Sequence, residues 1–500
     1  MIGSPASRFG ENDRLSKKKL AAIMVPCVIA IIAVIVITNP RQPTPAGQTY
    51  TLTTHINPSG AGSISPPGGE CQSGVQVALT ASPASGYRFV NWTGDVSTIA
   101  DLEDASTTIT MNDHYSITAN FALEILEIRD WYDLDAVRDD LGGSYVLMND
   151  LDSATAGYME LASETTNGGR GWEPIGTSDY GFTGSFNGQG HEIRDLFINR
   201  PDQDYVGLFA YVSWMHPIEN VGVVESVGVT NANVIGHYRV GTLVGHNAGI
   251  VNNSCSTYSA TSGGYYIGGL VGYSDGGFVS NAYSAGNVTG FRYVGGLVGH
   301  ITGARTVREG TVRNCYSTSS VTGGTRVGGL VGSTFADVEV SNSYFAGSVT
   351  GNRWVGGLVA ENYGGNVTNS YSTGNVTGSG YVGGLVAFNL WGTISSCYSA
   401  GTVSGDGPVG GLVGDNSEGV VNNSFWDTEN SGQGSSDGGT GKTTAEMKDI
   451  ATFAGAGWNI AAVDNRGMRN PSYIWNIVDG WTYPFLSWQS IPQHSWSLDD

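Results

Sequence analysis

The stretch Y-V-G-G-L-V-G, residues 293–299, recurs with small changes through the second half of this 500-residue chain. Alignment of the copies on their leucine gives successive separations of 35, 27, 27, 33, 28, 27 and 27 residues. The aligned leucines are Leu208, Leu243, Leu270, Leu297, Leu330, Leu358, Leu385 and Leu412. In the last seven copies a glycine lies two residues before the leucine, and a valine follows it. The chain therefore contains a repeat of about 27 residues with two insertions.

A second element separates the copies, for example N-A-Y-S-A-G-N-V-T-G at 281–290 and N-S-Y-S-T-G-N-V-T-G at 369–378. Each unit consists of short β-branched runs broken by Gly, Asn and Ser, without helical periodicity. Such a unit cannot bury its own apolar face, so successive units must stack and pair in parallel. The predicted fold is an all-β, parallel β-solenoid with the leucines in one internal file. Because parallel strands lie about 4.8 Å apart, eight coils would make a rod of about 38 Å.

The paired glycines of each copy need a structural reason, because glycine inside a strand costs roughly 0.5–1 kcal/mol relative to alanine. Two reasons fit: a positive φ at a corner, or the close approach of another backbone. We expect a tight corner that leads into the Leu-Val strand. The alternative is a flexible glycine-rich linker, but a linker would not keep valine and leucine in register.

The repeat resembles a known motif. The sequence G-L-V-G, alternating with the N-S-Y-S-T-G-N-V-T-G element, is similar to the GLUG motif of bacterial and archaeal surface proteins, including some peptidases that cleave IgA. The copies at Leu358 and Leu385 read G-L-V-A, and the copy at Leu243 reads T-L-V-G. These small changes leave the coil assignment in place. No H-E-x-x-H sequence is present, so the peptidase domain of some relatives is not expected.

Other segments resemble the same proteins, and together with the repeats they cover residues 125 to about 490. They are W-Y-D-L-D-A-V-R-D-D-L-G-G-S-Y-V-L-M-N-D-L-D (131–152), F-T-G-S-F-N-G-Q-G-H-E-I-R-D-L-F-I (182–198) and 424–447. We expect the solenoid to extend over 123–430, with GLUG-type repeats from about 205. A helix at about 131–141 would cap its first coil, because Leu134, Val137 and Leu141 have helical spacing. Residues 431–500 would form a C-terminal cap or tail.

Residues 50–122 are predicted to form a separate, small antiparallel β domain. The runs Y-T-L-T-T-H-I, V-Q-V-A-L-T-A and Y-R-F-V-N-W alternate apolar and polar residues between turns. The sequence from V-A-L-T-A-S-P to I-T-A-N-F-A resembles the divergent repeat domain of internalin-B-like surface proteins. That resemblance implies a spacer or a binding unit.

The N-terminus predicts a membrane anchor. Residues 20–38 are 19 uncharged residues, which as a helix would span about 28 Å of a hydrocarbon core of roughly 30 Å. Arg14, Lys17, Lys18 and Lys19 precede them, so we expect 1–19 in the cytoplasm and the bulk of the chain outside the cell. Residues 39–49 would be a Pro-rich linker. A cleaved signal peptide is the alternative, although I-T-N-P-R-Q-P is a poor cleavage site.

Charge is unevenly distributed, and it disfavours a nucleic-acid partner. Of the 44 acidic residues, 22 lie between 95 and 204, where there are five arginines and no lysine. The repeats at 239–424 hold eight acids and seven arginines. A nucleic-acid site needs clustered Lys and Arg, which neither region offers. The acidic stretch has no D-x-D-x-D-G loop for Ca²⁺, so we interpret it as a solvated face.

Two sequence features suggest a nucleotide site and a zinc site, but both are better explained as structural features. G-G-T-G-K-T-T at 438–444 lacks the first glycine of a phosphate-binding loop and does not follow a buried strand, so we expect a polar loop and no nucleotide. His246 and His300 occupy a repeat position that elsewhere holds Tyr, Ser, Glu, Phe or Asp. So varied a position indicates a solvent-facing turn. The two histidines are two coils, roughly 9.6 Å, apart and cannot share one zinc ion.

The cysteines and acids of the repeats give little sign of crosslinks or catalysis. Cys315 and Cys397 share a column three coils apart, so we expect free, mostly buried thiols. A polysaccharide lyase or glycosidase would need paired carboxylates in one groove. The acids of the repeats are scattered instead: Asp275, Glu309, Asp337, Glu339, Glu361, Asp406, Asp415 and Glu418. We predict that the chain is not an enzyme and needs no cofactor and no metal.

The predicted function is therefore display of a binding surface. We expect a membrane-anchored cell-surface protein whose solenoid takes part in adhesion to a glycan, a protein or another envelope component. The candidate ligand-stacking residues are a tyrosine column that is either a core ladder, the interpretation we favour, or an exposed strip that stacks on sugars: Tyr283, Tyr316, Tyr344, Tyr371 and Tyr398. A surface carbohydrate-active enzyme and a passive stalk are the alternatives.

Overall fold

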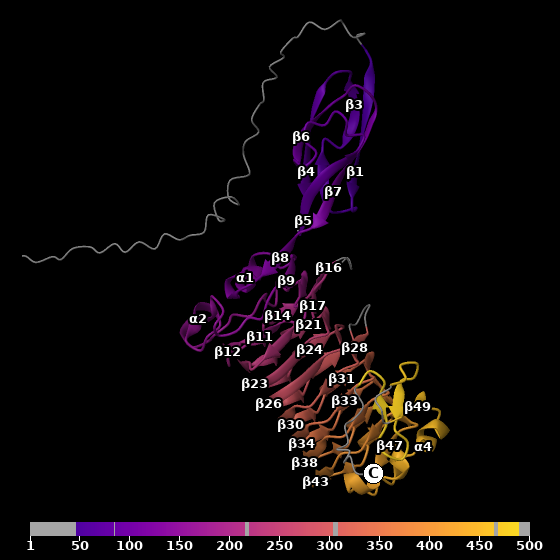
Figure 1. Ribbon diagram of the computed structural model, residues 1–500. Coiled ribbons are helices and arrows are strands. Elements are labelled where there is room, and N and C mark those ends of the chain that lie inside the picture. Colours follow the sequence, from indigo (N-terminus) through magenta and orange to yellow (C-terminus); the bar gives the residue numbers. More distant parts are fainter. Residues whose placement is uncertain (1–46, 85, 216–219, 304–308, 465–468, 490–500) are drawn as a thin grey trace, which may run out of the picture.

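The computed structural model describes residues 47–84, 86–215, 220–303, 309–464 and 469–489. The predicted cytoplasmic segment, the membrane span and most of the linker lie outside these ranges. None of the helices within them is long and apolar enough to cross a membrane. The described chain forms a small N-terminal domain, a long stack of coils and a C-terminal segment beside that stack (Figure 1).

The small N-terminal domain consists of two sheets around one apolar core that includes Trp92, Ile109 and Ile117. One sheet has the order β3-β1-β7-β5, with β1 (Thr49–Asn57), β3 (Gly68–Gln72), β5 (Tyr87–Gly94) and β7 (Tyr115–Leu123). The other has the order β2-β4-β6, with β2 (Gly62–Ser65), β4 (Gln76–Pro83) and β6 (Ser106–Thr110). The pairings are antiparallel as predicted, except that β1 and β7 run parallel.

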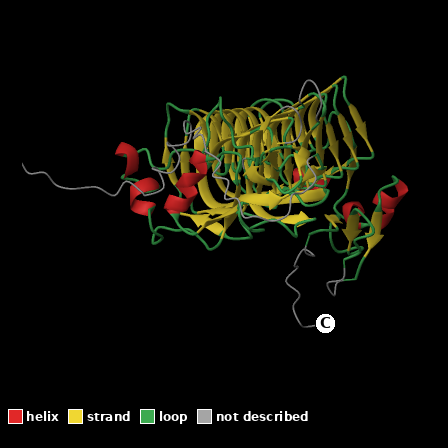
Figure 2. Cartoon of the chain, turned by 90° about the horizontal axis from the view of Figure 1, so that it is seen from above, coloured by secondary structure: helices red, strands yellow, loops and turns green. Residues whose placement is uncertain are grey.

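The rest of the chain confirms the predicted parallel β-solenoid. Three long sheets of 11, 20 and 8 strands run along the rod, and neighbouring coils pair in parallel. One coil passes through β24 (Val271–Asp275) of the 8-stranded sheet, β25 (Phe278–Ser280) of the 11-stranded sheet and β26 (Tyr283–Gly295) of the 20-stranded sheet. Figure 2 shows the strands stacked side by side along the rod.

The 8-stranded sheet begins one residue after each motif leucine. Its strands are β14 (Phe209–Val212), β21 (Val244–Asn247), β24, β27 (Val298–Thr302), β31 (Val331–Phe335), β35 (Val359–Tyr363), β40 (Val386–Leu390) and β45 (Val413–Ser417). Val271 pairs with Val298, and Val298 with Val331, so like positions of the repeat lie over one another. All eight motif leucines are fully buried in one continuous core, as the period predicted.

The paired glycines lie at the predicted corner into the Leu-Val strand, because the chain leaves the 20-stranded sheet at Gly295 and enters the 8-stranded sheet at Val298. Close backbone approach, and not a positive φ, is what requires glycine there. A Cβ atom on Gly295 would lie 2.0 Å from the carbonyl oxygen of Val298, and one on Gly296 would lie 2.0 Å from that of Gly329. The positive φ instead belongs to a bulky residue two positions before the first glycine, as at Tyr293 (φ 59°) and Trp354 (φ 56°). Glycine is required because a carbonyl oxygen of the same coil crowds the first glycine and one of the adjacent coil crowds the second, which leaves no room for a side chain.

A file of buried amides lies under the 8-stranded sheet. The Asn362 Nδ2 donates to Asn389 Oδ1 at 2.8 Å, and the Asn389 Nδ2 donates to Asn416 Oδ1 at 2.7 Å. Thr334 Oγ1 extends the file by donating to Asn362 Oδ1. Because a buried amide without partners is costly, the repeat of asparagine at one position stabilises the stacking register.

The four cysteines of the described chain are free, as predicted. Cys315 and Cys397 are fully buried in the core of the solenoid. Burial raises the pKa of each of these two thiols to about 12, so both stay protonated and unreactive at neutral pH.

The first coil is capped by a short helix. The predicted helix at 131–141 is shorter in the structure: α1 (Trp131–Asp135) is followed by one 3₁₀ turn, Ala136–Asp139. Asp130 caps α1 by accepting a hydrogen bond from the Asp133 backbone N–H. Trp131, Leu134 and Val137 are fully buried in the core of the solenoid, so this element covers its open end.

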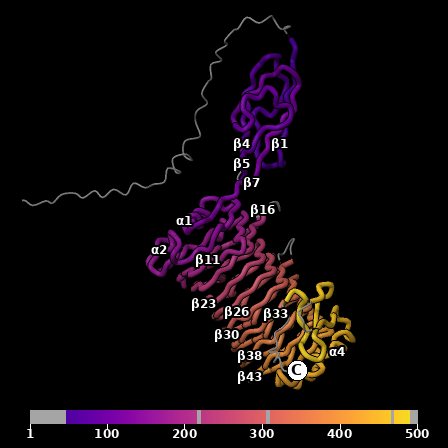
Figure 3. The backbone as a smooth tube through the Cα atoms, in the orientation of Figure 1, coloured from indigo at the N-terminus to yellow at the C-terminus, as the bar shows by residue number. Residues whose placement is uncertain are grey.

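The C-terminal segment first covers the end of the last coil, where the Gly411 N–H donates to the Ser435 carbonyl oxygen and the Asp437 N–H donates to that of Val413. It then packs beside the last coils (Figure 3). It includes α4 (Ile450–Gly455), β49 (Ile460–Ala462), β50 (Trp475–Ile477) and β51 (Phe485–Leu486). The G-G-T-G-K-T-T sequence forms β48 (Thr440–Lys442), which pairs with β47 (Phe425–Asp427) of the last coil. Lys442 forms an ion pair with Glu446 there, so this lysine has a structural partner.

Candidate functional site

The predicted tyrosine column forms a stacked ladder on the 20-stranded sheet. Tyr283 lies in β26, and the others begin β29 (Tyr316–Ser317), β33 (Tyr344–Phe345), β37 (Tyr371–Ser372) and β42 (Tyr398–Ser399). Neighbouring ring centroids are 4.8–5.0 Å apart and the rings are within 5° of parallel. The ladder lies outside the core of the solenoid, so the favoured interpretation as a core ladder is wrong. Tyr344, Tyr371 and Tyr398 pack into a separate cluster with the C-terminal segment.

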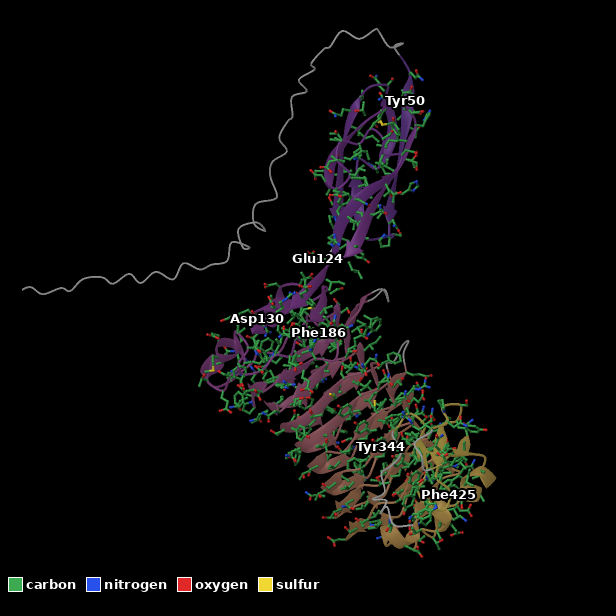
Figure 4. The ribbon with its side chains drawn as sticks, in the orientation of Figure 1. Tyr50, Glu124, Asp130, Phe186, Tyr344 and Phe425 are labelled. Atoms are coloured by element: carbon green, nitrogen blue, oxygen red, sulfur yellow. The ribbon has the colours of Figure 1, made fainter. Side chains whose placement is uncertain are left out.

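The C-terminal segment covers most of this ladder. The Tyr398 hydroxyl donates to the Pro484 carbonyl oxygen at 2.7 Å, and Tyr371 is hydrogen-bonded to the Gln489 side chain. The Trp488 ring lies 5.9 Å from Tyr344 and 6.3 Å from Tyr316. Figure 4 labels Tyr344 and Phe425 beside the C-terminal ribbon. The ladder therefore serves as a docking strip for the chain's own C-terminal segment.

Burial affects the tyrosines unequally. It raises the pKa of Tyr371 and Tyr398 well above the usual value and that of Tyr316 to about 12. Tyr283 and Tyr316 are only half-buried. A cavity of about 250 Å³ remains beside Tyr371 and Tyr398, with Lys448 and Trp481 among its other walls. Ligand stacking on the ladder stays a prediction, and Tyr283 and Tyr316 are among its less buried rings.

The outward face of the 8-stranded sheet is here called the lateral face. In contrast to the tyrosine ladder, its columns hold different residue types in successive coils. Its inner column holds the residue three after each motif leucine: Tyr211, His246, Tyr273, His300, Ser333, Glu361, Phe388 and Asp415. Ring centroids are 4.5 Å apart between Tyr211 and His246, 4.8 Å between His246 and Tyr273, and 5.4 Å between Tyr273 and His300.

The predicted solvent-facing turn at this column is wrong. The residues lie in strands, and His246 is only 9% exposed. Burial lowers the pKa of both His246 and His300 to about 3, so both are neutral at pH 7. The residue type varies between coils because each ring or polar group fits its own neighbours. Within the described ranges no three His, Cys, Asp or Glu residues are grouped as a metal site.

A second line of side chains borders the inner column on the corner that precedes the glycines. Its members have positive φ: Tyr205, Arg239, Tyr266, Tyr293, Arg326 and Trp354. The Arg239 guanidinium lies 4.6 Å from the Tyr205 ring centroid, and that of Arg326 lies 4.1 Å from the Trp354 ring centroid. Such cation–π stacking offsets part of the cost of a left-handed backbone at a bulky residue.

Glu361 forms an ion pair with Arg326, a member of this second line of side chains. Its two carboxylate oxygens accept hydrogen bonds from Arg326 Nε at 2.5 Å and Arg326 Nη2 at 3.0 Å, and Ser333 Oγ donates to it at 2.9 Å. Both charged side chains are only 12% exposed. Glu361 therefore serves as a structural partner of Arg326. Asp415, which shares its column, lies two coils away with Phe388 between them.

An outer column on the lateral face carries exposed aromatic rings that the sequence analysis missed. Asp275, Thr302, Phe335 and Tyr363 pair in register, one per coil, and Trp391 follows in the next coil. The Phe335 and Tyr363 rings stack at 4.7 Å, and Trp391 meets Tyr363 edge-on at 5.1 Å. Phe335 is 45% exposed and Trp391 53% exposed. We call Phe335, Tyr363 and Trp391 the aromatic strip.

The strip leads into a groove of about 840 Å³, the lateral groove. Its described lining is Tyr211, Trp214, Ala248, Tyr273, Asp275, His300, Thr302, Gly303, Phe335, Ala336 and Asp337. Phe335 belongs to both the groove and the strip. The groove also brings together Asp275 and Asp337, two acids that looked scattered in the sequence. Their coils are two apart, roughly 9.6 Å in backbone position. The position five residues after the motif leucine could have found Asp275, Thr302, Phe335 and Tyr363, whereas Trp391 is six residues after its leucine.

Two family models match the chain where the sequence resembled them. The divergent InlB B-repeat domain matches residues 50–125, and the GLUG motif matches residues 292–322, 351–377 and 378–404. The chain therefore carries both kinds of repeat.

Curated relatives share only part of the chain. A protein of Evansella cellulosilytica described as a Gly-rich membrane protein is 36% identical over 117 residues, which is 23% of this chain and 12% of the relative. Halomucin of Haloquadratum walsbyi is 31% identical over 160 residues, which is 30% of this chain and 2% of the relative. The chain thus spans a small fraction of the length of these relatives.

Among solved structures, the chain is similar to a protein of Bacteroides ovatus described as an immunoglobulin A1 protease. The two are 20% identical with a TM-score of 0.43, over 73% of this chain and 92% of the other. An IgA1 protease structure is 12% identical with a TM-score of 0.29, over 84% of this chain and 30% of the other.

Proposed function

We propose that this chain of GLUG-type repeats is a cell-surface adhesion protein, anchored by residues 20–38, that binds an envelope polymer or protein through the lateral face of its solenoid. The observation that carries the proposal is the lateral groove with its adjoining aromatic strip. Exposed rings such as Phe335 and Trp391 gather there, whereas an ordinary rod needs none. The description of the Evansella relative as a membrane protein supports the location.

The proposed topology follows from the charge of the N-terminus. Arg14 and Lys17–Lys19 precede the apolar run, so residues 1–19 would stay in the cytoplasm and the solenoid would lie outside. Protease added to intact cells should digest a C-terminal tag and spare an N-terminal one. Protection of both tags, or release of the full chain from membranes by high salt, would contradict the proposed anchor.

Adhesion can be tested with host cells that display the full chain. These cells should adhere to surfaces coated with peptidoglycan, mucin or intact bacterial cells, and a Phe335→Ala/Trp391→Ala double variant should lose most of that adhesion. Both side chains are exposed, so the variant should display normally. Absence of adhesion to every surface would favour the passive stalk. Equal adhesion by the variant would exclude the lateral face.

A surface carbohydrate-active enzyme is the second candidate, because the lateral groove holds two carboxylates, Asp275 and Asp337. Glycosidases place a pair of acids about 5–9.5 Å apart around the scissile bond. We nevertheless propose binding without turnover. Incubation of the full chain with neutral and acidic polysaccharides should release no shortened products by size-exclusion chromatography, and release that disappears in Asp275→Asn would favour the enzyme.

A further inference from the structure

The lateral groove and the aromatic strip form one continuous track along the rod. The groove extends from Tyr211, in the coil of Leu208, to Phe335, in the coil of Leu330. The strip continues from Phe335 through Tyr363 to Trp391, in the coil of Leu385. Seven coils at about 4.8 Å make a track of about 29 Å between its ends. Its length fits an extended polymer better than a single small molecule.

The rings of the track differ in what they offer to a ligand. In the tyrosine ladder each ring face is covered by the next ring, with interplanar angles of 2–5°, so only edges remain. Trp391 lies at 79° to Tyr363 and is 53% exposed, so a face of its indole stays open. Its Nε1 donates to Glu418 Oε2 at 2.8 Å, which fixes the orientation of the ring. An open, fixed aromatic face is a stacking platform.

Polar groups accompany these rings. In the described lining of the groove, Asp337 offers a carboxylate and Thr302 adds a hydroxyl. Carboxylates accept hydrogen bonds strongly and repel anions. Aromatic faces that bind C–H surfaces, next to acceptors that bind hydroxyl groups, suit a sugar ring. An extended glycan also presents one such ring at each repeat of a chain that can run parallel to the rod.

We propose that the lateral groove and the aromatic strip together bind an extended, uncharged polysaccharide, with successive sugar rings lying along successive coils. Trp391 is the stacking platform at one end, Phe335 lies at the junction, and the Asp337 carboxylate in the groove accepts hydroxyl hydrogen bonds. This inference rests on the proposed adhesive function and names the class of its ligand.

The test is calorimetric titration of the full chain, purified in detergent, with cellohexaose, chitohexaose and hexagalacturonate. At least one neutral hexasaccharide should bind, and its disaccharide should bind at least tenfold more weakly because it spans fewer coils. Trp391→Ala should weaken hexasaccharide binding about tenfold. The matched control is Phe291→Ala, which removes a ring that is 59% exposed on the 20-stranded sheet. It should leave the affinity within twofold.

Three results would overturn the inference: no binding by either neutral hexasaccharide, tighter binding of hexagalacturonate, or unchanged affinity in Trp391→Ala. The thermal midpoint of each variant should stay close to that of the parent chain, which shows that a lost affinity is not lost folding. If the hexasaccharides fail while displaying cells still adhere to coated surfaces, only the ligand class is wrong. If adhesion fails as well, the proposed function is wrong too.

Discussion

The two aromatic faces of the solenoid differ in what covers them. On the 20-stranded sheet, the tyrosine ladder is regular, and residues such as Trp475 and Trp488 of the C-terminal segment pack on it. On the 8-stranded sheet, the lateral face is irregular in sequence, and rings such as Phe335 and Trp391 remain exposed. The difference teaches that regular repetition marks internal packing here, whereas the varied positions carry the open surface.

The largest expected effect lies in the covered part of the ladder. Tyr398→Ala should lower the free energy of unfolding by about 3–5 kcal/mol, because it removes a fully buried ring and leaves a cavity. Tyr283→Ala, at the half-buried end of the same ladder, should cost less than about 1.5 kcal/mol. Urea unfolding at pH 7 measures both. Equal losses would show that the C-terminal segment does not cover the ladder.

The lateral face should be acid-sensitive, because His246 is buried, His300 is partly buried, and both are neutral. Their pKa of about 3 lies below the unfolded value of 6.5, so between these pH values the unfolded chain binds protons that the folded chain does not. Stability is fully present above pH 6.5 and falls with pH by up to about 1.4 kcal/mol per unit per histidine. For the two histidines together we expect a loss of about 4 kcal/mol between pH 7 and pH 5.

A double variant sharpens this pH prediction. His246→Phe/His300→Phe places the residue found at position 388 of the same column at both sites. Its unfolding free energy should change much less between pH 7 and pH 5 than that of the parent chain. Identical pH profiles would show that the histidines are not the buried bases of the lateral face.

The ion pair of the lateral face should have a smaller effect. Glu361→Gln should lower the free energy of unfolding by about 2 kcal/mol, because it leaves the largely buried Arg326 guanidinium without its carboxylate. Glu418→Gln is the matched control, since Glu418 is exposed and glutamine can still accept from Trp391. That control should stay within about 0.5 kcal/mol. If Glu361→Gln left the free energy of unfolding unchanged, the pair would be solvent-exposed and would not stabilise the fold.

Trp391→Ala should have the smallest effect on stability, although we expect it to weaken ligand binding strongly. Trp391→Ala should lower the free energy of unfolding by only about 1 kcal/mol, because half of the side chain is exposed. Thermal unfolding by circular dichroism measures this. A loss above about 2 kcal/mol would mean that Trp391 is a packing residue of the coil.

The 27-residue period was sufficient to predict the parallel stack, the internal leucine file and the free thiols, because a repeat that pairs in register fixes the position of every repeated residue. It could not predict what covers the tyrosine ladder. That depends on contacts between distant segments, such as the hydrogen bond from Trp488 Nε1 to the Asn342 carbonyl oxygen, 146 residues away.

The sequence also misled at the histidine column, because variability was interpreted as exposure. In the structure each varied residue packs against a particular neighbour, as Glu361 does with Arg326 and His246 with Tyr273. The lateral groove was missed for a related reason. Asp275 and Asp337 are 62 residues apart in the chain, and only the coil geometry brings them to one groove.

The most direct test of the contrast between the two faces is hydroxyl-radical footprinting of the folded chain, read residue by residue by mass spectrometry. The account predicts rapid oxidation of Phe335 and Trp391 and protection of Tyr371 and Tyr398 until the chain unfolds. Oxidation of Tyr371 and Tyr398 at the rate of Trp391 in the folded chain would contradict it.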